Sequence, residues 1–401
     1  MKSKIFQSKR IPSLDGMRAV SILLVLGGHS RFTLTLDGQV GRLLSPLLGN
    51  SSLGVAMFFV ISGFLITALL VKEAEEEGTI SLKQFYIRRI FRIMPAYYCF
   101  LAVMVLLAAA GIIQLHHRDT ACAFLFVYNY LPFHDWWLAH CWSLSVEEQF
   151  YLLWPLTLVL FGKRRCSYIA LGLIAFTPVV RMLNYVLIPG MRGLIPSMLH
   201  TRIDCLMFGC ATALLYDSPA FQRFLQACFS QKAHVFAIIY LFLISPYLTA
   251  TFASKYLASV GYTLEGFCTV LIMVWLIQNS RTLLGRLANS RPVVHLGVIS
   301  YSLYLWQEPF LTRQNETFSG QFPLNLLCGL VVAEVSYRLV EQPCLKLRRV
   351  LFPAGGEVVR PVLAGSPSPV LSVPRRASEL VPAMETPVGA LPSMGSSGKR
   401  E

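Results

Sequence analysis

The sequence predicts an all-α protein, a polytopic integral membrane helix bundle of about ten transmembrane helices. Its 401 residues are 55% hydrophobic and only 14% charged. The mean hydropathy is +0.56. A soluble domain of this length does not have such a composition. Repeated apolar runs are long enough to cross a hydrocarbon layer of about 30 Å.

The first of these runs, residues 14–31, rises about 1.5 Å per residue as a helix and is therefore about 25 Å long. The apolar run at 121–131 is too short to cross, so we expect it to be re-entrant or interfacial. The ten predicted spans are 14–31, 52–72, 93–113, 144–161, 166–187, 202–216, 233–252, 260–279, 293–312 and 322–345.

Lys and Arg are distributed unequally between the two ends of these spans. With the N-terminus inside, about three times as many fall on the cytoplasmic side as outside. The positive-inside rule therefore predicts that both termini are cytoplasmic. The net charge of +14 follows from this topology, and we do not expect a nucleic-acid partner.

We expect residues 1–350 to form one membrane domain. Residues 351–401 are rich in Pro, Ser and Gly, which predicts a disordered cytoplasmic tail. The N-terminal run has no small-residue cleavage site and should remain as a span. The ten cysteines show no metal-ligand spacing, and we expect no metal site.

The first span carries ionisable residues on one helical face. Arg18 and His29 are eleven residues apart, three turns of helix, and Asp15 lies one turn before Arg18. Ionisable groups at membrane depth usually face a bundle interior or a wet cavity, so this face is a candidate site. Alternatively, Asp15 and Arg18 pair at the membrane interface, and His29 is an ordinary interfacial histidine.

A cationic patch precedes the third span. Arg88, Arg89 and Arg92 are three or four residues apart, with aromatic residues beside them. Guanidinium groups bind phosphates bidentately, which favours a phosphate receptor. The alternative is a positive-inside anchor that contacts anionic membrane lipid.

Trp142, Glu147 and Glu148 open the fourth span at its outer end, where the outward-running first span also ends. His29 and Glu147 are therefore expected at similar depth and could act as a pair. Glu148 could simply complement the helix dipole.

Three further features have simpler alternatives. Arg202 and Asp204 begin the sixth span and could form an interfacial ion pair, and Tyr304 could belong to an aromatic belt. Gly54, Ser62 and Gly63 are small enough to let another helix approach closely.

Five ordered motifs resemble those of the membrane acyltransferase family 3, over about residues 10 to 350. They are Leu14-Asp-Gly-Met-Arg with His29, Phe58-Phe-Val-Ile-Ser-Gly-Phe, Phe85-Tyr-Ile-Arg-Arg-Ile-Phe-Arg-Ile-Met-Pro, Trp142-Ser-Leu-Ser-Val-Glu-Glu-Gln-Phe-Tyr and Tyr301-Ser-Leu-Tyr-Leu-Trp.

The resemblance implies O-acylation of a sugar hydroxyl in a bacterial inner membrane, with acyl-CoA, in particular acetyl-CoA, as donor and no permanently bound cofactor. The family's functional residues match His29 and Glu147, with Arg18, Arg88, Arg89 and Arg92 for the donor. Asp15, Trp142, Glu148, Asp204 and Tyr304 are candidates for substrate binding. Gln307 departs from the family, since many relatives have histidine there. Larger relatives carry a fused extracytoplasmic domain, so a separate periplasmic acyltransferase could be a partner.

We expect CoA phosphates to bind the arginine patch, and His29 to act as base or acyl-carrying nucleophile together with Glu147. A proton-coupled membrane transporter is the alternative, because proton relays also use buried His, Glu and Arg.

The predicted topology can be tested with reporter fusions. Fusions after Arg118 and after Arg165 should report opposite compartments, because one predicted span separates them. Identical readouts would contradict the topology.

Overall fold

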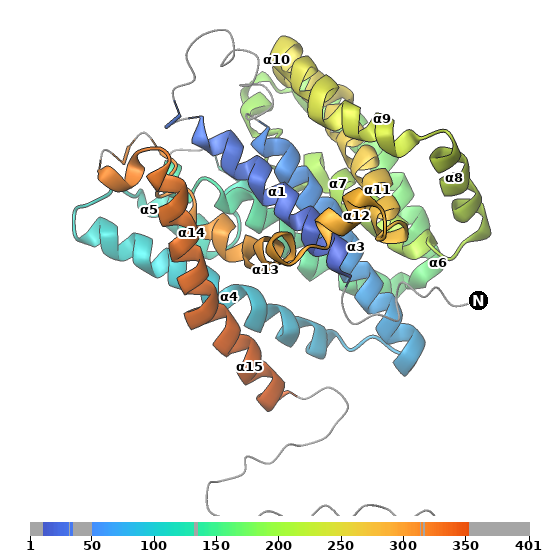
Figure 1. Cartoon of the computed structure of the whole chain (residues 1–401), viewed down its shortest axis with the longest axis horizontal. Helices are drawn as coiled ribbons and strands as arrows, with labels where there is room; N and C mark the ends of the chain where they lie inside the picture. The colour runs from blue at the N-terminus through green and yellow to red at the C-terminus, as the bar shows by residue number, and fades with distance from the viewer. Residues whose placement is uncertain are drawn as a thin grey trace, which may run out of the picture. The chain divides into compact units, whose positions relative to one another are not determined.

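The structure, a computed structural model, describes residues 11–31, 33–34, 50–131, 135–312, 314–315 and 317–352. Within these ranges the regular elements are helices and there is no strand, which confirms the all-α prediction (Figure 1). The α-helices are α1 (Pro12–Ser30), α3 (Ser51–Glu77), α4 (Leu82–Ala109), α5 (His117–Phe124), α6 (Cys141–Leu187), α7 (Leu199–Leu215), α8 (Pro219–Ser230), α9 (Ala233–Ile239), α10 (Ser245–Tyr256), α11 (Tyr262–Gln278), α12 (Leu283–Ala288), α13 (Arg291–Trp306), α14 (Leu324–Ser336) and α15 (Gln342–Leu351).

Each of the ten predicted spans falls on helical structure in the described ranges. Five helical stretches there are long and apolar enough to cross a membrane, and two of them, Trp136–Leu187 and Ala233–Gln278, contain 52 and 46 residues. Within α6 the helical backbone is interrupted at Gly162, where φ is 70°. The membrane helix bundle is thus confirmed, and the number of ten crossings stays a prediction.

The short apolar run at 121–131 forms no long helix. It contributes to α5 and to a 3-10 turn at Tyr128–Tyr130. Eight residues of α-helix rise about 12 Å, less than half of a hydrocarbon layer.

Small residues bring α1, α3 and α7 into close contact at the centre of the bundle. A Cβ on Gly63 of α3 would overlap the backbone oxygen of Leu206, and one on Gly209 of α7 would overlap that of Val60. Gly54 is similarly close to the backbone of α1. The predicted close approach is therefore confirmed for Gly54 and Gly63, whereas Ser62 points its hydroxyl to Glu147.

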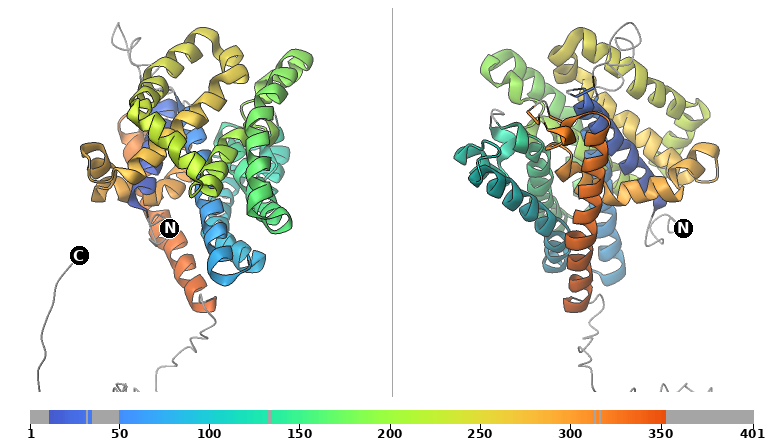
Figure 2. Two further views of the ribbon diagram at one scale, coloured as in Figure 1. Left: turned by 90° about the vertical axis from the view of Figure 1, so that its right-hand side faces the viewer. Right: turned by 60° about the vertical axis from the view of Figure 1, so that its left-hand side comes forward.

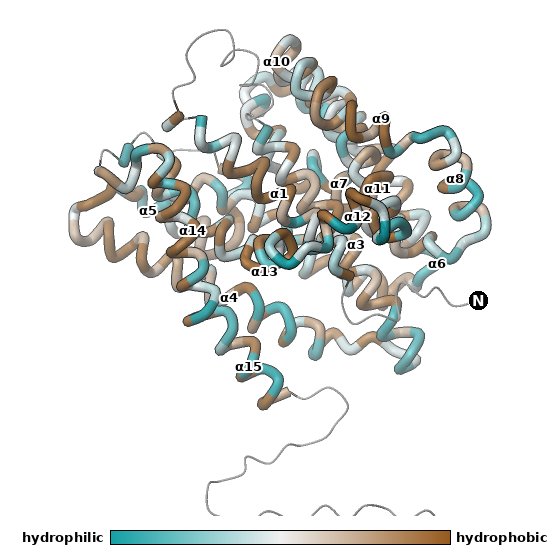
Figure 3. The backbone as a smooth tube through the Cα atoms, in the orientation of Figure 1, coloured by the Kyte–Doolittle hydropathy of each residue, from teal (hydrophilic) through white to brown (hydrophobic). Residues whose placement is uncertain are grey.

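The outer faces of the bundle are apolar. Leu152 and Leu160 of α6, and Leu327 of α14, are more than half exposed. In Figure 2, α14 and α15 run on from each other as one rod, joined by a π-helical turn at Tyr337–Glu341, and α15 packs against α4. Hydrophilic residues gather at the end of α3 and at the start of α4, and they alternate with hydrophobic ones along α15 (Figure 3).

The predicted tail, residues 351–401, lies outside the described residues except for Leu351 and Phe352. Its disorder therefore stays a prediction.

Substitution of Gly63 should destabilise the bundle. We expect Gly63→Leu to lower the free energy of unfolding by about 1–3 kcal/mol or more, because the added side chain meets the α7 backbone. Thermal unfolding in detergent would measure this. Gly172→Leu is the matched control, since open space surrounds Gly172 on α6, and equal melting of the two variants would contradict the packing argument.

Candidate active site

Two neighbouring cavities lie inside the bundle. The first, about 630 Å³ and here called the arginine cavity, is lined by five arginines from three helices. Those arginines are Arg18 of α1, Arg89 and Arg92 of α4, and Arg348 and Arg349 of α15. The same cavity is lined by four carboxylates, those of Asp15, Glu147, Glu148 and Glu341.

The second, about 380 Å³, is here called the histidine cavity. His29, His140, Trp136, Trp142 and Glu308 line it. Val55 and Tyr304 line both cavities, so these two side chains lie between them.

Helix α1 connects the cavities. Arg18 lines the arginine cavity and His29 lines the histidine cavity, about 16 Å further along the same helix. The Arg18 Nε–H donates to the Ser300 hydroxyl of α13 at 3.2 Å. The ionisable face predicted for the first span therefore does face the interior of the bundle.

His29 is held by residues that directly follow α13. Its Nδ1 lies 2.8 Å from Gln307 Oε1 and 3.9 Å from Glu308 Oε1. The ring also makes an edge contact with Trp136, with centroids 5.7 Å apart. An amide oxygen only accepts, so the contact is a hydrogen bond in the tautomer that carries its proton on Nδ1, and Nε2 then has a lone pair.

Glu308 also binds a second histidine. Its Oε2 lies 2.8 Å from Nδ1 of His140, a fully buried residue, and accepts from the His140 backbone N–H at 3.3 Å. Nε2 of His140 has no hydrogen-bond partner among the described residues. One carboxylate therefore lies between two imidazoles in the histidine cavity.

The predicted pairing of His29 with Glu147 is wrong. Glu147 Oε1 accepts from Ser62 at 2.8 Å and Oε2 from Tyr151 at 3.2 Å, and its carboxylate lines the arginine cavity. Similar depth did not imply contact, because α1 and α6 turn these side chains toward different cavities. Glu148, one residue on, also lines the arginine cavity.

Only part of the predicted arginine patch faces the arginine cavity. Arg89 and Arg92 line it, and Arg89 lies over the rings of Phe85 and Tyr151. Arg88 instead forms an ion pair with Glu73 at 2.5 Å, so its grouping with the other two is corrected. Glu73 lies at the end of α3, where it also accepts from the Ser81 backbone N–H at 2.9 Å.

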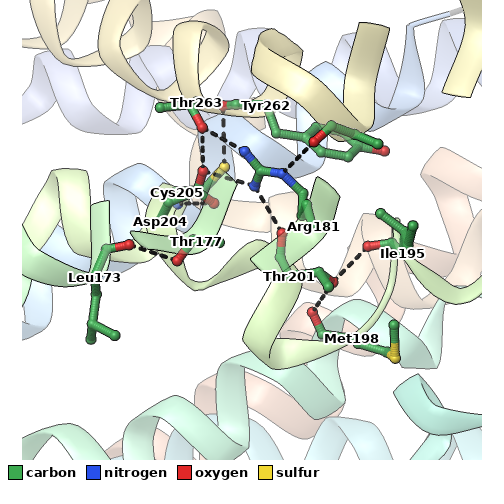
Figure 4. A network of polar contacts seen from close by, with 11 residues as sticks. Leu173, Thr177, Arg181, Ile195, Met198, Thr201, Asp204, Cys205, Tyr262 and Thr263 are labelled. Carbon is green, nitrogen blue, oxygen red and sulfur yellow. Dashed lines mark hydrogen bonds and ion pairs between the residues drawn. The ribbon is translucent and has the colours of Figure 1, made fainter. Parts of the chain in front are cut away.

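Asp204 forms an ion pair with Arg181 of α6, with Arg181 Nη1 2.8 Å from the carboxylate and both side chains fully buried (Figure 4). Arg181 also donates to Thr263 and to the Thr201 carbonyl. The alternative of an interfacial Arg202–Asp204 ion pair is not seen among the described residues, since Arg202 lies over the Tyr262 ring, 3.6 Å from its centroid. Asp204 lines neither cavity.

The remaining substrate candidates lie in the cavities. Trp142 lines the histidine cavity, and Asp15 the arginine cavity. The Tyr304 hydroxyl bonds Ser143 and donates to the His140 carbonyl at 3.3 Å.

The segment that carries Trp136 is held in place by Asp135. Its carboxylate accepts from the His116 backbone N–H at 2.7 Å and lies 2.6 Å from His116 Nδ1. This hydrogen bond, together with the charge of Asp135, raises the pKa of His116.

Sequence comparison supplies the family. The sequence model of a family described as an acyltransferase domain matches residues 11–333. The chain belongs to this family. It is 28% identical over 382 residues to peptidoglycan O-acetyltransferase OatA of Listeria monocytogenes, covering 85% of this chain and 57% of that protein. It is 27% identical over 372 residues to O-acetyltransferase OatA of Staphylococcus aureus NCTC 8325, covering 86% and 58%.

The chain thus spans less than three fifths of the length of these relatives. No solved structure matches it significantly. The family resemblance predicted from the five motifs is confirmed.

The Arg181–Asp204 pair generates a stability prediction. Asp204→Asn should lower the free energy of unfolding by about 3–5 kcal/mol, because it leaves a fully buried guanidinium without its counter-charge. Thermal unfolding in detergent is the measurement.

Arg338→Ala is the control for this substitution. It breaks an exposed pair with Glu334, and such pairs contribute little to stability. Comparable losses in the two variants would argue against a special role of the buried pair.

Proposed function

We propose that this protein is an inner-membrane O-acyltransferase, with both termini in the cytoplasm. It transfers an acyl group, in particular acetyl, from cytoplasmic acyl-CoA to a sugar hydroxyl of a cell-surface or secreted glycan or glycolipid. The observation that carries the proposal is the pair of cavities that share Val55 and Tyr304, one cationic and one with a partnered histidine. The names of the relatives, which specify O-acetyl transfer and in one case peptidoglycan, support the glycan acceptor.

The donor occupies the arginine cavity. Arg18, Arg89 and Arg92 face its interior, and guanidinium groups match phosphate oxygens in charge and geometry. Glu147 accepts two hydroxyl hydrogen bonds beside them, so its role is to fix this cavity rather than to orient His29. The acyl end of the donor then points toward Tyr304 and the histidine cavity.

His29 acts as the general base. Gln307 accepts a hydrogen bond from the Nδ1–H of His29, which leaves Nε2 free to take up the proton of the sugar hydroxyl. The hydroxyl oxygen bonds to the acyl carbon, the carbon–sulfur bond of the thioester breaks, and the proton passes to the departing thiolate. A covalent acyl-His29 that subsequently acylates the sugar uses the same nitrogen and stays open.

Glu308 is the positioning residue for His29. Its carboxylate lies near Nδ1 of His29 and stabilises the positive charge that develops there when Nε2 takes up a proton. His140 fixes the other oxygen of Glu308. Trp136 and Trp142 supply the aromatic walls expected of a binding pocket for the acceptor.

Membership of an acyltransferase family favours transfer over the transporter alternative. The buried Arg181–Asp204 pair, the kind of group that proton relays use, lines neither cavity. A separate periplasmic acyltransferase remains a candidate partner for a later transfer step.

Variants at His29 and Glu308 test the mechanism. In inverted vesicles supplied with radiolabelled acetyl-CoA, His29→Ala should lower turnover by about 10²–10⁴-fold. Glu308→Gln should lower kcat with little change in donor KM, and the double variant should be little worse than His29→Ala, because the two groups act together.

Glu334→Gln is the matched control for Glu308→Gln. Glu334 also binds a histidine, His295, at 3.0 Å, but lines neither cavity, so turnover should stay near wild type. Multiplying losses in the double variant, or an equal loss in Glu334→Gln, would refute the coupled pair. Wild-type vesicles that form no acylated product would refute the transferase itself.

A further inference from the structure

Two arginines of α15 line the arginine cavity in addition to those of the cationic motif on α4. Arg348 and Arg349 line the same cavity as Arg89 and Arg92 of α4, because α15 packs against α4. From sequence alone these two residues are ordinary cytoplasmic anchors. Their position in the cavity wall is a feature of the tertiary structure.

In the part of the chain that the structure describes, Arg348 and Arg349 have no carboxylate partner. No hydrogen bond or ion pair joins Arg348 or Arg349 to another described residue, and Nε of the half-buried Arg348 is enclosed without a partner. Burial lowers the pKa of Arg348, as do the charges of Arg349, Arg88 and Arg92, all of them cations. The carboxylate of Glu341, by contrast, accepts a hydrogen bond from Ser302 and interacts electrostatically with Arg92 and Arg18.

An uncompensated pair of guanidinium groups fits a dianionic phosphomonoester. Coenzyme A carries one on the 3′ oxygen of its ribose, at the end of the molecule opposite the acyl thioester. If the thioester lies toward Tyr304, this phosphate lies at the far end of the cavity.

We propose that Arg348 and Arg349 bind the ribose 3′-phosphate of the donor and select CoA over its 3′-dephospho form. This inference rests on the proposed use of acyl-CoA. It assigns α15, which lies beyond residue 333, where the family match ends, to substrate recognition.

Calorimetric titration of the whole protein in phosphatidylcholine nanodiscs, with CoA and with 3′-dephospho-CoA as probes, tests the proposal. Wild type should prefer CoA by roughly ten- to a hundredfold, the range expected for charge-assisted contacts to one phosphate. Arg348→Ala/Arg349→Ala should lose this preference by weakening CoA alone. If the double variant misfolds, the single variant Arg349→Ala is titrated instead, because Arg349 is exposed and its loss should not disturb folding; it should weaken CoA binding in the same direction.

Lys346→Ala is the matched control, since Lys346 is an exposed cation of α15 outside the cavity wall, and it should retain the preference. If the double variant keeps the preference, the inference is wrong while the proposed function stands. If wild type binds neither probe, acyl-CoA is not the donor and the proposed function fails instead.

A lipid phosphate could occupy the same guanidinium groups. The titration is therefore repeated in nanodiscs that contain phosphatidylglycerol. An unchanged CoA preference supports the donor subsite. A preference abolished by phosphatidylglycerol would make the two arginines a lipid-headgroup site and overturn the inference.

Discussion

Charge inside an apolar helix bundle is costly unless it has a partner or faces a cavity, and two groups of ionisable residues in this protein follow these two solutions. The Arg181–Asp204 pair follows the first solution, with both side chains fully buried and fully bonded across α6, α7 and α11. The arginines of α1, α4 and α15 follow the second, because they line a cavity in which cations outnumber carboxylates. The first arrangement holds helices together, whereas the second leaves charge available for an anion.

The same constraint orders the site along α1. The helix carries Arg18 in the arginine cavity and His29 in the histidine cavity, so one rigid element fixes the separation between the proposed donor subsite and the proposed base. Glycine contacts between α1, α3 and α7 support this helix at the distance of backbone contact. The proposed transfer from a donor in one cavity to an acceptor in the other requires such a fixed relation.

Sequence reasoning predicted the helices, the family and the inward-facing positions of Arg18 and His29, because helical periodicity and the cost of buried charge are local properties. It failed where the partner depends on how helices are rotated against one another. The sequence predicts a similar depth for Glu147 and His29. In the structure Glu147 lines the arginine cavity, whereas His29 lines the histidine cavity. Arg181 is an isolated cation within an apolar run, a pattern that indicates a buried partner. Arg348 and Arg349, by contrast, cannot be distinguished in the sequence from cytoplasmic anchors.

Val55 and Tyr304 line both cavities, so the two side chains lie where the cavities approach each other. Side-chain rotation is faster than the movement of packed helices, so under the proposed mechanism a rotation of Tyr304 would let an acyl arm reach His29 while the helices stay in place. The Tyr304 hydroxyl is bonded to Ser143 and to the His140 carbonyl, and His140 in turn holds Glu308. If the donor binds as proposed, displacement of Tyr304 would disturb His140 and Glu308, and through Glu308 the proposed base His29. The proposed mechanism thus links arrival of the acyl group to the state of the base.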